Sequence, residues 1–301
     1  MSDRFPDFLI IGEMRCGTTT LWGLLERHPE VHFPERKETH FFSSYAGGEG
    51  ALRLATGGLA AYGELFAGAA MGQRCGEATP SYLFDPEACE RIHEALPDAR
   101  LLVILRDPVA RAWSHYWHQV RRGRESLGFE EALEAEPTRL ASGDPATQVR
   151  FAYRARGRYV EGLERYASQF GREALCVVFL EELRRDPRPV LETLYAHIGI
   201  AAAGPDIDLA LPHANRADFP RWPRLDAAIR MLRDGLQRHA PALAGPAQHL
   251  GRLTRSFRVY SGAPRLAETT RRDLEGDFLA SDRSLAAWLG RELPWRAGAS
   301  Q

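Results

Sequence analysis

The sequence predicts a three-layer α/β fold in which a central, mostly parallel sheet is flanked by helices. Two apolar runs carry this prediction. Residues 101–105 form a continuous apolar run, which is typical of a strand buried on both faces of a parallel sheet. Residues 8–11 form a second run, which leads into a glycine-bounded loop and a helix start. Further strands are expected at 31–33, at 175–180 and near 73–77.

The loop after the first strand is suited to binding an anion. Residues 8–21 read Phe-Leu-Ile-Ile-Gly-Glu-Met-Arg-Cys-Gly-Thr-Thr-Thr-Leu. Loop amides and a helix N-terminus supply positive potential, and glycines let the backbone approach a phosphate or sulfate. Gly12 and Gly17 have the spacing of the nucleotide P-loop, so a P-loop-like fold is predicted. Thr18 replaces the lysine of that motif and Arg15 supplies the charge, so the usual ATP or GTP signature is missing.

A second candidate anion site follows the strand expected at 101–105. Asp107 is a typical helix N-cap and Pro108 a typical first helical residue, so a helix should begin there. Arg106 stands at the carboxyl end of the strand, where ligands bind in open parallel sheets. Ser114 lies about two turns into the helix. A guanidinium fork and a hydroxyl in these places predict a site for a second phosphate.

These motifs, in this order, resemble the sulfotransferases that depend on 3′-phosphoadenosine 5′-phosphosulfate (PAPS). The resemblance is to the branch with the heparan sulfate N- and 3-O-sulfotransferases and many bacterial relatives. Residues 8–21 are similar to its 5′-phosphosulfate loop, and residues 101–114 to its 3′-phosphate motif. Residues 37–42, Lys-Glu-Thr-His-Phe-Phe, resemble its Lys-Glu-Pro-His-Phe-Phe segment. Residues 76–82 resemble its Glu-x-Thr-Pro-x-Tyr segment, and residues 157–187 also match in order.

The sequence departs from the family pattern at three positions. Arg15 stands where the phosphosulfate loop usually has lysine; it keeps the charge but is planar and bulkier. Ser43 stands where the glycosaminoglycan enzymes often have aspartate, and Ala78 where they have a second lysine. The last two departures count against a heparan-like acceptor and leave donor binding untouched.

The resemblance implies in-line transfer of a sulfuryl group from PAPS to a hydroxyl or amine of a carbohydrate or small-molecule acceptor. Positioning and charge stabilisation dominate such reactions. Glu38, carried over from the family position, is the expected general base. His40 is the rival, because cytosolic sulfotransferases use a histidine in a somewhat similar setting. If residues 37–42 are extended, Glu38 and His40 point to the same side. Arg15 is expected to stabilise the leaving phosphate oxygen.

The resemblance also implies the remaining site residues. The 5′-phosphosulfate is expected to contact Arg15, Cys16, Gly17, Thr18, Thr19 and Thr20. Arg106 and Ser114 are expected to bind the 3′-phosphate, which distinguishes this donor from ATP. Three residues are candidate contacts of the sulfuryl group or acceptor, with core or surface positions as the alternative: Lys37, Phe41 and Tyr82.

Cysteine and histidine spacing predicts no metal site and no disulfide framework. Cys16 lies near a helix N-terminus, where the pKa of a thiol tends to fall, so it is a candidate oxidation site.

A chain of 301 residues with 44% hydrophobic content can bury a large core. One domain is expected over 1–301, with a donor-binding core at about 8–200 and a C-terminal helical segment at about 204–295 packed over it. A net charge of −1 gives no general attraction to nucleic acid. No apolar run is long enough to span a bilayer, and Asp3 and Asp7 interrupt any signal-peptide pattern, so the protein is expected to be cytoplasmic.

Four segments outside the motifs carry weaker predictions. Residues 45–63 form a Gly/Ala-rich insertion that could lie over the site, and residues 141–148 should form a loop. Residues 264–276 and 282–290 are predicted to form two short helices.

Two other functions are open at this point. A P-loop kinase or NTPase would share the loop, but the lysine after the second glycine is absent and no clear Mg²⁺-binding aspartate follows a strand. A non-catalytic nucleotide-binding scaffold would keep the fold without the chemistry. Retention of Glu38 together with the whole anion loop argues against the scaffold.

Overall fold

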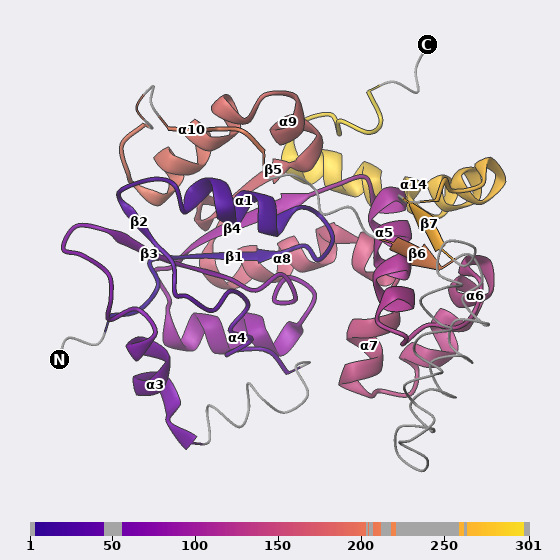
Figure 1. The fold of residues 1–301 in the computed structure, drawn as a ribbon, viewed down its shortest axis with the longest axis horizontal. Helices are drawn as coiled ribbons and strands as arrows, with labels where there is room; N and C mark the ends of the chain where they lie inside the picture. The colour runs from indigo at the N-terminus through magenta and orange to yellow at the C-terminus, as the bar shows by residue number, and fades with distance from the viewer. Residues whose placement is uncertain are drawn as a thin grey trace, which may run out of the picture.

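The central sheet has five strands, and every strand is parallel to its neighbours (Figure 1). The computed structural model describes residues 4–44, 56–202, 204, 207–211, 218–220, 259–261 and 264–297. Across the sheet the strands are β2 (Val31–His32), β3 (Arg74–Ala78), β1 (Phe8–Gly12), β4 (Arg100–Leu105) and β5 (Leu175–Phe179). All five predicted strands are confirmed, with ends that differ by at most one residue. A short antiparallel pair is formed by β6 (Asp218–Pro220) and β7 (Val259–Ser261).

Alternate residues of the strands enter two different cores, which creates the three layers. Phe8 and Ile10 of β1 pack in one core with α1 (Thr18–Leu25) and α10 (Pro187–Ile198). Leu9 and Ile11 pack on the opposite face with α4 (Pro86–Ala95) and α8 (Tyr159–Phe170). All four strand side chains are fully buried, as expected for a parallel sheet covered on both faces. The predicted three-layer fold is therefore confirmed.

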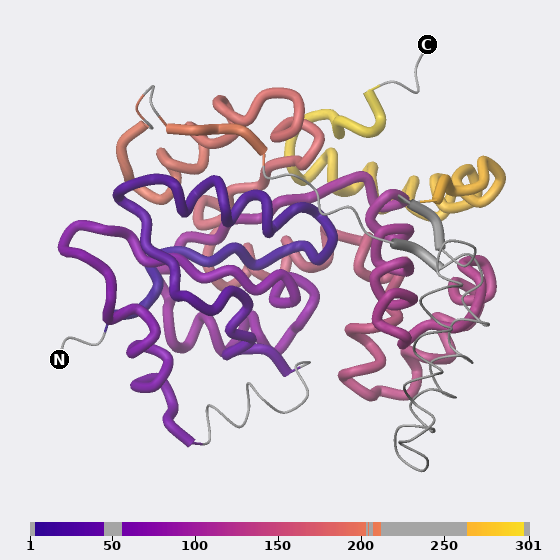
Figure 2. Tube along the Cα trace, in the orientation of Figure 1, coloured from indigo at the N-terminus to yellow at the C-terminus, as the bar shows by residue number. Residues whose placement is uncertain are grey.

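A third core lies beside the sheet and positions the helix that follows β4. Figure 2 shows the chain segment over 108–151 grouped at one side of the sheet. The elements there are α5 (Pro108–Arg121), α6 (Phe129–Leu140) and α7 (Pro145–Phe151), with α14 (Glu268–Leu289) against them. The remaining short elements are α3 (Gly58–Glu64), α9 (Leu180–Arg185) and the 3₁₀ turns η1 (Ala155–Gly157) and η2 (Arg172–Ala174). No helix in the described part of the chain is both long and apolar enough to cross a membrane.

The predicted start of α5 is confirmed. The Asp107 side chain accepts a hydrogen bond of 2.9 Å from the amide of Val109, and Pro108 is the first helical residue. The cap fixes where the helix begins, so Arg106 stays outside it at the carboxyl end of β4. The local sequence thereby places one arginine at the edge of the sheet.

Two of the weaker predictions are wrong. The loop expected at 141–148 gives way to α7 at Pro145, because Asp144 caps this helix by accepting from the amide of Thr147. The two helices expected at 264–276 and 282–290 are one helix, α14. Gly276 does not end it, because Phe278 in the next turn is buried in the third core. Of the insertion at 45–63, residues 45–55 lie outside the described residues, and α3 begins at Gly58.

Candidate active site

A cavity of about 500 Å³ opens where β1, β3 and β4 end, and we call it the main cavity. Its lining comes from the loops after these strands, from α1, α5, α7 and α9, and from Glu38 and His40. A second cavity of about 460 Å³ adjoins it and shares four lining residues with it: Arg15, Arg106, Ser114 and His118. This is the edge at which open parallel sheets bind their ligands.

The loop after β1 brings a helix N-terminus to the main cavity. Thr18, Thr19 and Thr20 open α1 and line the cavity, and no side chain caps this helix. The first amides of α1 are therefore left for a ligand. Gly17 has φ of 98°, and a Cβ there would lie 2.6 Å from the side chain of Leu180. Glycine is thus required both by the turn and by the close packing of the loop on α9.

The predicted cationic residues meet at this loop. Arg15 Nε donates to Ser114 Oγ at 3.1 Å, and Arg106 Nη1 donates to the Arg15 carbonyl at 3.4 Å. No carboxylate among the described residues pairs with either arginine. Burial and then the neighbouring Arg106 lower the pKa of Arg15. Burial and then nearby arginines, Arg15 first, lower the pKa of His118 to about 4. Burial is the larger cause of both pKa shifts, and the positive charge of the neighbouring arginines adds to it; a bound anion would relieve that second part.

The candidate base lines the same main cavity. Lys37 Nζ donates to Glu38 Oε1 at 2.8 Å, and His40 Nε2 lies 3.8 Å from Glu38 Oε2. Ser81 Oγ lies 3.4 Å from His40 Nδ1. The side chains of Glu38 and His40 are 40% and 29% exposed, and both line the main cavity. The two candidate bases therefore share one wall with access to a ligand, while Lys37 lines neither cavity and holds Glu38.

The segment that carries these two residues is not extended, so they reach the same cavity by another route than strand geometry. Glu38 has φ of 61° and His40 has φ of 54°, both in the left-handed region. The two side chains share a wall because Thr39 between them turns inward and is buried.

A buried carboxylate, Glu77, holds this conformation in place. Four hydroxyl groups donate to it: Thr39 Oγ1 at 2.5 Å, Thr79 Oγ1 at 2.6 Å, Tyr62 OH at 2.7 Å and Tyr82 OH at 3.0 Å. Burial raises the pKa of Glu77, and the hydroxyl donors act against that rise. Three of the four hydroxyls also accept from the backbone of the segment: Thr79 from the amide of His40, Thr39 from the amide of Phe41 and Tyr82 from the amide of Phe42. We call Glu77 and these four donors the hydroxyl hub.

Three predicted site residues have side chains that lie in the interior. Phe41 and Tyr82 are 1% and 0% exposed, and Phe41 stacks on Tyr62, so neither ring can contact an acceptor. The Cys16 side chain is also fully buried, with Sγ 3.7 Å from Tyr159 OH. Burial raises the pKa of Cys16 to about 12, which is opposite to the predicted fall at a helix N-terminus.

Sequence reasoning missed several residues of the main cavity. His118 lies one helical turn beyond Ser114, and this i, i+4 spacing was an available signal. Ser81 lies inside the 76–82 motif, so it too could have been found. Arg122 belongs to a cluster of arginines over 121–124 at the end of α5, which the sequence itself shows, whereas no local pattern connects Arg184 of α9 to the site. The described His, Cys, Asp and Glu side chains form no group of three or more that could hold a metal ion.

Comparisons with known proteins agree on one family. A model of the Sulfotransferase family matches residues 38–204, which is more than half of the chain and begins after the anion loop. The human heparan sulfate glucosamine 3-O-sulfotransferase 6 is 41% identical over 113 residues, or 38% of this chain and 30% of that protein. The human 3-O-sulfotransferase 3B1 is 30% identical over 201 residues, or 66% of this chain and 47% of that protein.

Among solved structures, a sulfotransferase from Alicyclobacillus acidocaldarius is similar, with a TM-score of 0.61 and 32% identity. That match covers 81% of this chain and 92% of the other. The first curated relatives are longer proteins, and the chain spans between about a quarter and a half of their length.

Proposed function

Because the chain belongs to the sulfotransferase family, we propose that it transfers a sulfuryl group from PAPS to a hydroxyl or amine of a carbohydrate or small-molecule acceptor. One observation carries the proposal. A single cavity combines a cationic anion cradle with a carboxylate that is open to ligand.

The donor site fits an anion with two phosphate-containing groups. We assign the N-terminus of α1 and Arg15 to the 5′-phosphosulfate, and Arg106 with Ser114 to the 3′-phosphate. The lowered pKa of Arg15, caused by burial and by Arg106, supports this assignment because two anionic groups would neutralise the cluster. PAPS supplies the activated sulfuryl group. Arg15 stabilises the charge that develops on the leaving phosphate oxygen.

Glu38 acts as general base and takes the proton of the acceptor group. The ammonium of Lys37, 2.8 Å from Glu38 Oε1, orients this carboxylate. His40 has its Nε2 3.8 Å from the same carboxylate and its Nδ1 3.4 Å from Ser81, so it is the second candidate for the base.

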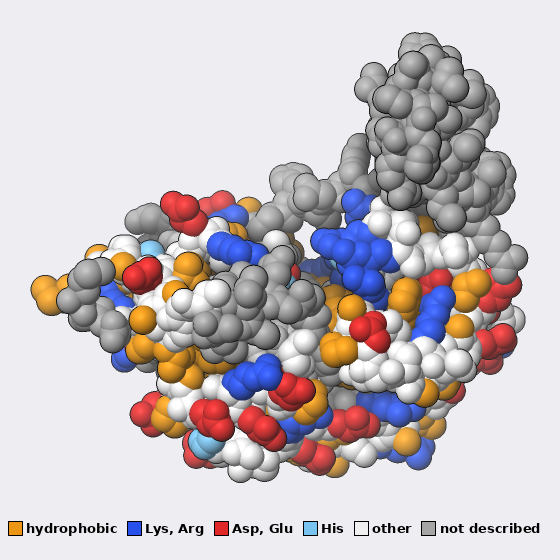
Figure 3. Space-filling model, turned by 90° about the horizontal axis from the view of Figure 1, so that it is seen from below, with side chains coloured by type: hydrophobic (Ala, Val, Ile, Leu, Met, Phe, Trp, Pro, Cys, Tyr) orange, Lys and Arg blue, Asp and Glu red, His pale blue; other side chains and the backbone are white. Residues whose placement is uncertain are grey.

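The acceptor side of the proposal rests on relatives and on charge. The curated relatives act on heparan sulfate glucosamine by name, which favours a carbohydrate. Arg122 and Arg184 line the main cavity in addition to the donor residues, and Figure 3 shows Lys and Arg side chains gathered on one face of the molecule. We therefore favour an acceptor with a negatively charged group. Ser43 and Ala78, which depart from the glycan-enzyme pattern, are buried and do not line the cavity.

The experiment that tests the donor assignment measures thermal stabilisation by 3′,5′-ADP and compares it with stabilisation by 5′-ADP and by ATP·Mg²⁺. A ligand at about 100 times its Kd adds roughly 2.7 kcal/mol to the free energy of unfolding. Loss of a charge-assisted bond of about 1.5–3 kcal/mol in Arg106→Ala would reduce that gain to about 0.3–1.3 kcal/mol at the same ligand concentration. Arg283→Ala, an exposed arginine on α14, is the matched control.

Selective stabilisation by 3′,5′-ADP that is lost only in Arg106→Ala supports the proposal. A preference for ATP·Mg²⁺ would favour the kinase or NTPase alternative. Binding of 3′,5′-ADP without sulfuryl transfer to any acceptor, in wild type and Glu38→Gln alike, would favour the scaffold.

A further inference from the structure

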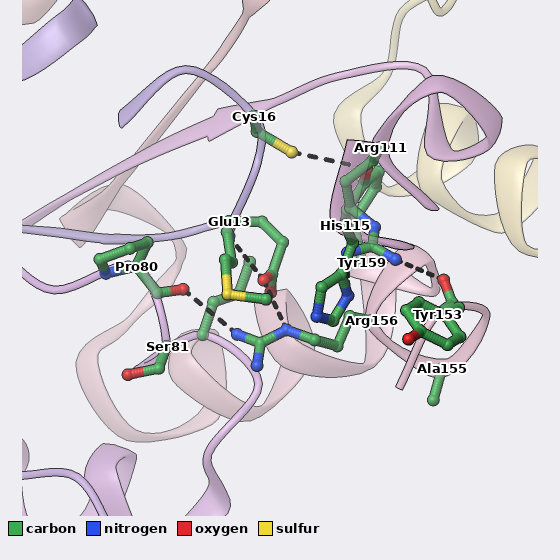
Figure 4. A network of polar contacts seen from close by, with 12 residues as sticks. Glu13, Cys16, Pro80, Ser81, Arg111, His115, Tyr153, Ala155, Arg156 and Tyr159 are labelled. Atoms are coloured by element: carbon green, nitrogen blue, oxygen red, sulfur yellow. Dashed lines mark hydrogen bonds and ion pairs between the residues drawn. The ribbon is translucent and has the colours of Figure 1, made fainter. Parts of the chain in front are cut away.

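Beneath the donor loop, the junction of η1 and α8 carries two buried polar side chains, Arg156 and Tyr159, which we call the bracket. Both are almost fully buried, at 1% and 2% exposed. Figure 4 shows Arg156 reaching toward Glu13 and Pro80, with Tyr159 near Cys16. Neither residue lines the main cavity, so their role is not to bind ligand directly.

Arg156 joins the loop after β1 to the loop after β3. Its Nε donates to Glu13 Oε1 at 2.8 Å, and its Nη2 donates to the Pro80 carbonyl at 3.5 Å. The amide of Met14 donates to the same carboxylate oxygen at 2.6 Å, so the ion pair holds the backbone immediately before Arg15. Pro80 in turn precedes Ser81, which contacts His40.

Tyr159 joins the loop after β1 to the loop after β4. Its hydroxyl donates to the Arg106 carbonyl at 2.8 Å and lies 3.7 Å from Cys16 Sγ. The bracket therefore contacts Glu13 and Cys16, which flank Met14 and Arg15, and it also contacts Pro80 and Arg106. These are the three loops that carry the donor cradle and support one of the candidate bases.

The burial of an ion pair is weak evidence for stability, because desolvation offsets the attraction between the charges. Arg156 Nη1 is buried and has no hydrogen-bond partner among the described residues, which adds a further cost, although the guanidinium also lies 4.8 Å from the centre of the Phe84 ring. A small cavity of about 30 Å³ lined by Glu13 and Arg156 has room for one water beside it. A well-packed apolar pair would fill this space without that cost, so the charged pair calls for a reason other than stability.

We propose that Arg156 and Tyr159 are positioning residues that fix the donor loop, the Pro80–Ser81 turn and Arg106 relative to one another. The inference rests on the proposed sulfuryl transfer. Misplacement of reacting groups by about 1 Å can lower a rate about 100-fold, so a rigid link between three loops that hold the reacting groups has a direct effect on turnover.

The test uses two variants that keep side-chain volume and remove the links. Tyr159→Phe loses only the hydroxyl. Glu13→Gln/Arg156→Met removes both charges, while the amide oxygen of the new side chain still accepts from the backbone of Met14. Controls of the same kind lie away from the cavity. They are Tyr153→Phe, whose hydroxyl donates to Glu125 at 2.9 Å, and Glu125→Gln/Arg139→Met, which removes an ion pair with a buried carboxylate and a partly buried guanidinium.

Each variant is measured for melting temperature, Kd for 3′,5′-ADP, kcat for sulfuryl transfer, and hydrogen exchange at the amides of residues 13–17. The bracket variants are expected to lose about 10- to 100-fold in kcat and to exchange faster over 13–17. The controls, at a similar loss of melting temperature, should keep kcat within about twofold. Bracket variants that match their controls in kcat and exchange would overturn the inference. Failure of the wild type to bind 3′,5′-ADP would instead overturn the proposed function.

Discussion

Replacement of Glu38 by glutamine is the most direct test of the chemistry. The amide keeps the shape of the side chain and still accepts from Lys37 Nζ, now 2.8 Å from the carboxylate. The backbone bond from the Glu38 amide to the Ala78 carbonyl, at 3.1 Å, is unaffected. What is lost is basicity. A positioned general base accelerates a reaction about 10²- to 10⁴-fold, so Glu38→Gln should lower kcat by about that factor. The loss corresponds to about 2.7–5.4 kcal/mol in the activation barrier.

Donor binding provides the internal check for this variant. Glu38 adds negative charge to a cavity proposed to bind an anion, so Glu38→Gln should leave the Kd for 3′,5′-ADP unchanged or lower it. The assay is transfer of labelled sulfate from PAPS to a panel of hydroxylated carbohydrates and phenols. Weaker binding of 3′,5′-ADP by Glu38→Gln would show that Glu38 contributes to donor binding, which contradicts its assignment as the base alone.

His40→Gln is the comparison that decides between the two candidate bases. The contact of 3.8 Å between His40 Nε2 and Glu38 Oε2 is partly exposed, and such pairs contribute about 0.2–1 kcal/mol. Loss of this contact alone predicts a fall in kcat of less than tenfold. A fall of 100-fold or more in His40→Gln, with Glu38→Gln within tenfold of the wild type, would refute the assignment of Glu38 and make His40 the base.

Four further predictions follow from three buried positions. With the pKa of Cys16 raised to about 12 by burial, roughly one thiol in ten thousand is ionised at pH 8, so iodoacetamide should label this cysteine only after unfolding; rapid labelling of native Cys16 would contradict its burial. In Gly157→Ala the new Cβ would lie 2.6 Å from the Phe278 ring, and overpacking of this kind should cost about 1–3 kcal/mol in denaturant unfolding, whereas an unchanged midpoint would show that the third core can yield. Glu77→Gln should lose little stability, because its oxygen can accept from three hydroxyls and its amide can donate to Tyr62, while Glu77→Leu leaves all four hydroxyls of the hub without an acceptor and should lose several kcal/mol. Burial raises the pKa of Glu77 in the folded state, so ionisation of this group costs stability as pH rises above its pKa in the unfolded state. The stability of Glu77→Gln relative to the wild type should therefore increase with rising pH. The opposite trend would contradict a carboxylate that is desolvated on folding.

The strands and the start of α5 were predictable because each depends on a short stretch of sequence. The run over 101–105 is apolar at every position, and its strand is buried on both faces. Asp107 and Pro108 act through the backbone of the residues next to them. The same locality holds for the anion loop, where glycine spacing indicates the turn whatever packs behind it.

The predictions that failed depend on distant parts of the chain. The pKa of Cys16 is governed by what covers the thiol, and Tyr159 is 143 residues away in the sequence. For Phe41 and Tyr82 the motifs leave a ligand contact and a core position open, and packing with Tyr62 and Phe66 places both in the core. Burial by residues that are distant in the sequence cannot be predicted from a six-residue motif alone.

The conformation of the segment over 37–42 shows how the site is built from such distant contacts. Among the described residues, the only non-glycine residues with positive φ are Arg15, Glu38 and His40, and all three line the main cavity. Such conformations cost about 1–3 kcal/mol each and persist where the surroundings over-determine them. The hydroxyl hub supplies that constraint for Glu38 and His40, and the bracket supplies it for Arg15. We infer that the buried polar groups behind the cavity hold the backbone of the residues that face the ligand in these conformations.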